Sequence, residues 1–249
     1  MISRRDFVIS STALCIHALL REARAAIPAS SSIPASRWIG RQDELARGLA
    51  SGTISQIEWY NATNALAKEV DVADLSRAIR RATTLSMRTP LGHEPRRRFI
   101  AFKDEQDVMV HLAYGVALFE FNTNSVIAPH AHKHMASAHM VVEGKVHVRT
   151  FDRVRDEEGA LIIRPSSDAI AEVGHAAAMT PEKDNVHWFA SRSDRAMTLD
   201  VLVEDLDKGQ ESYEVQPVDT LNGTVLPDGT IRAPLVSFEQ SRKIYSVDA

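Results

Sequence analysis

The chain changes character after Pro90, where short runs rich in β-branched and aromatic residues begin. Clusters of turn-forming residues separate these runs, which include RRFIAF, VMVHLAYGVALFEF, KVHVRTF, ALIIRP, NVHWFA and MTLDVLV. Many short strands with regular turns are typical of an antiparallel sandwich or barrel and disfavour a parallel α/β sheet. We therefore predict a mainly β fold with one barrel over residues 95–215. The extension over 216–249 has turn signals of its own, and we expect it to form a hairpin or an oligomer arm.

The region before the barrel, residues 36–90, has apolar residues at helical spacing. We interpret it as an N-terminal helical annex of three amphipathic helices, whose apolar stripes are packing surfaces. Gly52 is the expected end of the first helix, and Thr53 with Gln56 resembles a capping box that opens the second. Asp71 with Asp74 is the expected start of the third helix, whose apolar residues are Leu75, Ile79 and Leu85.

Residues 1–25, MISRRDFVISSTALCIHALLREARA, have the order of a signal peptide, with a positive start, an apolar middle and small residues at the end. The pair Arg4-Arg5 resembles a twin-arginine export signal, which carries folded proteins out of the bacterial cytoplasm. A membrane anchor is the alternative, but the apolar run is shorter than the ~20 residues that a bilayer requires. We predict cleavage after Ala25, a periplasmic or exported protein with no membrane contact after cleavage, and an unstructured linker over residues 26–35.

Composition excludes several classes of function. The formal charge is −4 and no basic stripe is present, so nucleic acid is not an expected partner. Cys15 is the only cysteine and lies in the predicted leader, so the mature chain has no disulfide and no thiolate ligand. Any metal ion must therefore be held by histidine and carboxylate side chains.

Four of the ten histidines lie within the segment APHAHKHMASAHMVVEG, residues 128–144. On a strand, side chains two positions apart share a face, so His130 and His132 can reach one ion. His187, in the alternating segment TPEKDNVHWFA, is the best candidate for a third ligand. His134 shares the parity of the pair and remains an alternative ligand, whereas His139 is a candidate catalytic residue or a fourth ligand.

These motifs resemble the cupin superfamily, in which a His-x-His pair and a later histidine bind a metal inside a double-stranded β-helix, or jelly-roll, barrel, and a glycine follows the pair at a turn. Here the pair is His130 and His132, the glycine is Gly144, and the later histidine is His187. Ser137 stands where many cupins have a glutamate ligand. The resemblance therefore implies either a three-histidine centre or a fourth ligand from His139.

The flanking residues resemble a narrower group, the thiol dioxygenases related to cysteamine dioxygenase and plant cysteine oxidases. The resemblance covers about half of the chain and rests on four elements: the histidine pair with its glycine, Phe151-Asp152, Asn185-Val186-His187 and Leu199-Asp200-Val201-Leu202. The chain departs from the pattern at Lys133-His134, where the family usually has Pro-Gly. It also has Glu204-Asp205-Leu206 where the family has Pro-Pro-Tyr.

The thiol dioxygenase resemblance implies one divalent metal ion, with Fe(II) as the leading candidate. This ion would promote the oxidation of a small thiol, or of another small chelating substrate, by O2. The residues alone leave Zn, Ni, Mn or Cu as alternatives, because imidazole also binds the borderline ions zinc, nickel and copper, and manganese is a candidate for a non-oxidative cupin. A cupin lyase, isomerase or decarboxylase and a non-catalytic small-ligand-binding cupin are the alternative functions. Cupins often form homodimers, so a second copy of the chain is a further expected partner.

Overall fold

The computed structural model describes residues 32–207 and 212–245. The chain divides into two compact units, Met1–Ser32 and Ile33–Ala249, and the second unit contains everything that follows. The predicted signal peptide and most of the predicted linker lie outside the described residues. At the end of that linker the prediction is wrong, because Ile33 forms a β-bridge with Val70 and Ala35 begins a helix.

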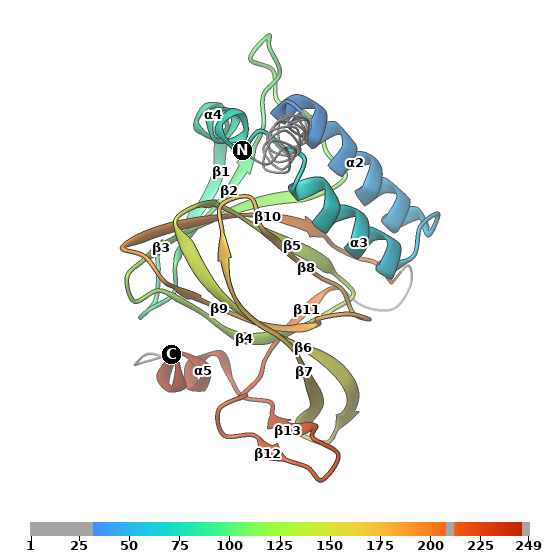
Figure 1. Ribbon diagram of the computed structural model, residues 1–249, viewed down its shortest axis with the longest axis vertical. Coiled ribbons are helices and arrows are strands. Elements are labelled where there is room, and N and C mark those ends of the chain that lie inside the picture. Colours follow the sequence, from blue (N-terminus) through green and yellow to red (C-terminus); the bar gives the residue numbers. More distant parts are fainter. Residues whose placement is uncertain (1–31, 208–211, 246–249) are drawn as a thin grey trace, which may run out of the picture. The chain divides into compact units, whose positions relative to one another are not determined.

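The strands form two antiparallel sheets around a shared interior (Figure 1). The first sheet has the order β1 (Thr83–Arg88), β2 (Arg96–Ala101), β3 (Gly115–Asn122), β10 (Arg195–Val203), β5 (Ala136–Glu143) and β8 (Ala176–Met179). The second has the order β11 (Glu214–Pro217), β4 (Val126–Lys133), β9 (Val186–Ser191), β6 (Lys145–Glu157), β7 (Ala160–Glu172), β13 (Ile231–Pro234) and β12 (Thr224–Val225). The prediction of a mainly β barrel of the double-stranded β-helix class, with an N-terminal helical region, is confirmed.

Alternation along the strands gives the first sheet two different apolar faces. Its outer face presents Leu118, Met140 and Leu199 to the helices, where they pack in one core with Trp38 and Trp59. Its inner face contributes residues such as Phe121 and Val141, which pack against Val148 and Phe189 of the second sheet in a separate core. Both faces of this sheet are therefore buried, which explains why β3, β5 and β10 read as nearly continuous apolar runs.

Three helices precede the barrel: α2 (Ala35–Ser51), α3 (Gln56–Ala67) and α4 (Val72–Arg81). Figure 1 shows α2 and α3 beside the sheet that contains β10, β5 and β8, in agreement with contacts of α3 to β5 and β8. A short helix, α5 (Phe238–Ile244), contacts β4 of the other sheet. Among the described residues, none of the helices combines the length and the hydropathy that a membrane span needs.

The helix boundaries agree with the sequence at two points. Gly52 adopts a left-handed conformation, φ 77°, and closes α2 by donating its N–H to Gly48 and Leu49. Asp71 is the N-cap of α4 and accepts a hydrogen bond from the Asp74 N–H.

Two other boundaries differ from the prediction. The capping box of α3 is formed by Ser55 and Glu58, because Thr53 donates its N–H to Gly48 and belongs to the end of α2. The helical region also ends at Arg81, and Leu85 lies in β1, paired with β2, with 60% of its surface exposed. The adjacent β-branched Thr83 and Thr84 favour this extended conformation.

The C-terminal segment adds to the second sheet. β12 and β13 form the expected hairpin, and β13 pairs in turn with β7. β11 pairs with β4 and spans the predicted boundary at residue 216. The hairpin prediction is confirmed, whereas the oligomer arm stays a prediction.

Candidate metal centre

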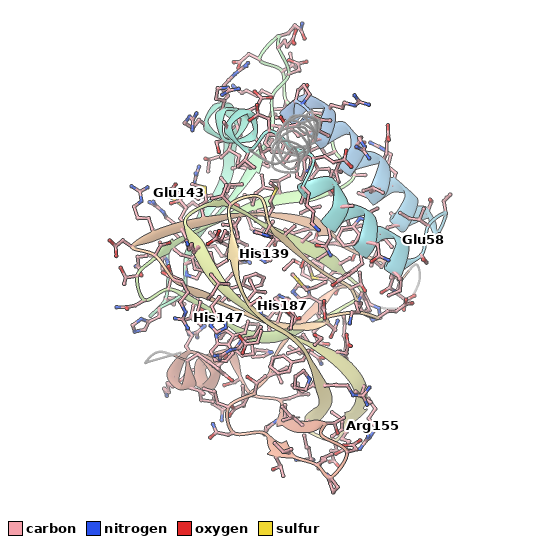
Figure 2. The ribbon with its side chains drawn as sticks, viewed as in Figure 1. Glu58, His139, Glu143, His147, Arg155 and His187 are labelled. Atoms are coloured by element: carbon pink, nitrogen blue, oxygen red, sulfur yellow. The ribbon has the colours of Figure 1, made fainter. Side chains whose placement is uncertain are left out.

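The structure brings together the three histidines that the sequence singled out as metal ligands. His130 and His132 lie on β4, His187 lies on β9, and the strand register places His130 directly opposite His187. One nitrogen from each imidazole lies within 4.8 Å of the others, and the ring centroids are 4.1 to 4.9 Å apart. In Figure 2, His187 projects into the space between the sheets. This is the spacing at which three side chains can share one ion.

Burial sets the protonation state of this cluster. It lowers the pKa of His130 to about 4, and it holds the pKa values of His132 and His187 well below their usual range. The imidazoles are therefore neutral at pH 7, which leaves a lone pair on each ring available for a metal. The mutual repulsion of their charged forms acts in the same direction.

Backbone carbonyl groups orient two of the rings. His130 Nδ1 lies 2.9 Å from the Ala128 carbonyl oxygen, and His187 Nδ1 lies 3.3 Å from the Asn185 carbonyl oxygen. A ring that donates through Nδ1 presents its Nε2 lone pair to the interior. Asn185 also donates from Nδ2 to the His132 carbonyl oxygen at 2.7 Å, so it ties β4 to the segment before β9.

The donor atoms fit a metal ion. Within the described part of the chain, the buried Nε2 of His187 and Nδ1 of His132 have no hydrogen-bond partner. Leaving a buried polar atom unsatisfied costs about 1–3 kcal/mol. A divalent ion on His187 Nε2 would satisfy that atom, and a set of neutral nitrogen donors suits iron, nickel, copper or zinc.

His139 lies on the opposite wall and outside the three-histidine cluster. It is on β5, its ring centroid is 6.3 Å from that of His187, and Figure 2 shows it projecting toward the same interior. Its Nδ1 lies 3.1 Å from Thr198 Oγ1 and its Nε2 lies 3.5 Å from Asp200 Oδ2. Both ring nitrogens of His139 thus face partners on β10, and burial lowers its pKa to about 3.

Asp200 is a site residue that the sequence indicated only as part of a motif. It is directly opposite His139 in the strand register, only 2% of its surface is exposed, and its Oδ1 has no hydrogen-bond partner among the described residues. Burial raises its pKa well above the usual range for a carboxyl. A single acidic residue within the apolar run MTLDVLV was the sequence signal for this position.

His134 takes no part in the cluster. It follows β4 with a positive φ of 56°, and its Nδ1 lies 3.6 Å from Asp207. The left-handed conformation ends the strand, so the parity that His134 shares with His130 and His132 does not persist in space.

A cavity of about 540 Å³ opens beside the histidines. His130, His132, His139 and Asp200 line it together with Arg97 of β2 and residues of α5. Pockets of this size accommodate drug-sized ligands. Arg97 was not among the residues predicted from the sequence, because it sits in a run of three arginines that resembles a solvated edge.

Residues 106–212, less than half of the chain, match a family model described as PCO_ADO, a thiol dioxygenase family. The matched segment contains His130, His132, His187 and Asp200. No curated protein matches the chain.

Several solved structures resemble the fold at low identity. KdgF from Halomonas sp. is 14% identical, with a TM-score of 0.34, over 47% of this chain and 84% of that one. An uncharacterized protein with a double-stranded β-helix domain from Klebsiella pneumoniae is 15% identical, with a TM-score of 0.33, over 51% and 84% of the two chains. Vicilin from Capsicum annuum is 10% identical, with a TM-score of 0.36, over 56% and 34%.

Proposed function

We propose that this protein is a mononuclear iron dioxygenase that oxidises a small thiol to a sulfinate. One observation carries the proposal: three neutral imidazoles, two of them lining a ligand-sized cavity, converge within 4.8 Å inside a barrel whose sequence matches a thiol dioxygenase family. His130, His132 and His187 would hold the iron. When bound, Fe(II) supplies a site where a thiolate and O2 can meet and exchange electrons.

The reaction balances without a further reductant. Both atoms of O2 form bonds to the thiol sulfur, the sulfur loses four electrons, and O2 gains the same four. The S–H proton is released, so that RSH and O2 give RSO2⁻ and H⁺. A neutral ligand set favours an anionic donor, because three imidazoles leave the positive charge of a divalent ion uncompensated.

His139 and Asp200 are proposed to accept the proton that the thiol releases. They lie directly opposite each other on β5 and β10, and both line the cavity. A carboxyl whose pKa is raised by burial and an imidazole whose pKa is lowered can hold one proton between them near neutral pH. Thr198 orients the imidazole through Nδ1, so that Nε2 remains directed at Asp200.

Oxygen consumption with a panel of small thiols tests the proposal. Protein loaded anaerobically with Fe(II) should consume one O2 per sulfinate formed, and ¹⁸O₂ should label both sulfinate oxygens. His187→Ala should lose both the bound iron and the activity. His147→Ala is the matched control, because His147 lies on β6 in a network with Asp168 and Arg192 and does not line the cavity. Zinc retention with turnover of a substrate in the absence of O2 would replace the proposal with a non-oxidative cupin.

Export to the periplasm is also proposed, on the leader sequence of residues 1–25. Folding before export would let the protein acquire its metal in the cytoplasm. Periplasmic protein should begin at residue 26 by mass spectrometry, and replacing Arg4 and Arg5 by lysine should retain the protein in the cytoplasm. Full-length protein in the cytoplasmic fraction of unmodified cells would refute this proposal.

A further inference from the structure

Arg97 of β2 lines the cavity and lies close to two aromatic rings. Its guanidinium carbon lies 5.1 Å from the Phe99 ring centroid and 6.0 Å from that of Phe119. Phe119 is directly opposite Arg97 in the register of β2 and β3, and residues opposite each other in an antiparallel pair share a face. Phe119 contacts His139 in turn, with ring centroids 5.0 Å apart. Arg97 thus lies on the inner wall that also bears His139.

The neighbouring arginines show that this placement is selective. Arg96 and Arg98 alternate with Arg97 on β2, and both donate from Nε to Glu120 on the other face of the sheet, each at 2.7 Å. Arg97 makes no ion pair within 4 Å to any residue that the structure describes. The run of three arginines therefore consists of two paired outer cations and one inner cation without a counter-ion.

The surroundings of Arg97 make an anion the missing partner. Burial and the charge of Arg88, which is directly opposite on β1, both lower the pKa of Arg97. The charges of Asp200 and Glu94 oppose this effect, but neither forms an ion pair with Arg97, and Glu94 already contacts Arg242 at 3.4 Å. A half-buried cation beside a second cation costs free energy, and a bound anion would offset that cost.

We propose that Arg97 binds a carboxylate at the far end of the substrate, so that the natural substrate is a thiol acid. The guanidinium has a planar donor pair that matches a carboxylate in a bidentate arrangement. The cavity joins Arg97 to His130 and His132, so one molecule can place its sulfur at the histidines and its carboxylate at the arginine. Arg97 also lies before the segment matched by the family model, so that match did not assign it a role.

Ring contacts link Arg97 to the metal centre. Phe119 lies beside both Arg97 and His139, and the His139 ring centroid is 6.3 Å from that of His187. The cavity of about 540 Å³ has room for a small thiol acid. This inference rests on the proposed function for the identity of the sulfur end, but the carboxylate end depends on Arg97 alone.

Two compounds of the same shape test the inference. 3-Mercaptopropionate carries the carboxylate, and 3-mercaptopropionamide replaces it with a neutral group. The unmodified enzyme should favour the acid about 10- to 100-fold in kcat/KM, as expected for charge-assisted hydrogen bonds. Arg97→Gln should reduce that preference to about twofold or less, mainly through a higher KM for the acid. Arg97→Lys should keep an intermediate preference for the acid, because lysine retains the positive charge but lacks the planar pair of N–H donors.

Arg96→Gln is the matched control. It removes an arginine from the same strand, but on the face that points to Glu120, so the acid should remain preferred to the same extent. Equal kcat/KM values for the two compounds in the unmodified enzyme would overturn the inference. So would an undiminished preference in Arg97→Gln, provided that its iron content and thermal midpoint match those of the unmodified enzyme.

Anaerobic calorimetry separates this inference from the proposed function. Tighter binding of 3-mercaptopropionate than of the amide, lost in Arg97→Gln, would support the carboxylate site even if no thiol were oxidised. In that case the dioxygenase proposal would fail and the inference about Arg97 would stand. Oxidation of both thiols with no discrimination between them would instead support the dioxygenase proposal and overturn the inference about Arg97.

Discussion

Gly144 is the position where a single added methyl group should be most damaging. It is the one residue between β5 of the first sheet and β6 of the second, and it has a φ of 69°. A Cβ at this position would lie 2.2 Å from the Arg195 carbonyl oxygen and 2.5 Å from Ser193 Oγ. Ser193 Oγ accepts a hydrogen bond from the Lys145 N–H and donates to the Arg195 carbonyl oxygen, so it cannot move away without loss.

The cost of Gly144→Ala has two parts. A left-handed conformation costs a residue with a Cβ about 1–2 kcal/mol. Overpacking against backbone that cannot yield adds about 1–3 kcal/mol. We therefore expect the free energy of unfolding to fall by about 2–5 kcal/mol.

Gly159→Ala isolates the steric part. Gly159 has nearly the same φ, 66°, but a Cβ there would meet nothing within 4 Å. Gly159→Ala should therefore lower the free energy of unfolding only by the cost of the left-handed conformation. Either Gly→Ala replacement also reduces the conformational entropy of the unfolded chain, and this effect is the same in both variants. Urea unfolding of the two variants, followed by tryptophan fluorescence at matched metal content, measures the difference. Free energies of unfolding within about 0.5 kcal/mol of each other would refute the argument from close approach, because about 1–3 kcal/mol is expected between them.

Three further predictions concern pH, metal and the helical region. The metal-free protein should lose stability as the pH falls from 6.5 to about 4, because histidines in the unfolded chain take up protons there, whereas burial keeps the pKa values of His130, His132, His139 and His187 low. The raised pKa of Asp200 acts in the opposite direction, but it is one group against four. Urea midpoints that do not change across this range would contradict the assignment of neutral imidazoles. Saturation with Fe(II) at about 100 times its Kd should stabilise the protein by about 2.7 kcal/mol, an effect that His187→Ala should abolish in a thermal scan. Tyr60→Phe should cost about 1–3 kcal/mol, because the Tyr60 hydroxyl of α3 donates to the buried Asp184 at 2.6 Å; an unchanged urea midpoint would show that this bond does not stabilise the fold.

Local patterns were sufficient for the fold class and for two of the three histidines of the metal cluster. A strand has a period of two, so His130 and His132 had to project from one face wherever β4 lay. Turn residues such as Gly144 and the hairpin turn before β13 mark where strands end, because their backbone requirements are local. Helix signals misled where two features overlapped, as at Thr53, which serves the end of α2 rather than the start of α3.

Contacts between distant strands required the tertiary structure. His187 was named as the third histidine from its place in an alternating segment, but only the register of β4 against β9 shows that it meets His130. The pairing of His139 with Asp200 follows from the register of β5 and β10, which neither segment specifies alone. The inward direction of Arg97 likewise depends on its place opposite Phe119. The period of a strand fixes which of its side chains share a face, and this can be read from the residues alone. The relative registers result from packing the two sheets around one core, and they set which of those faces meet.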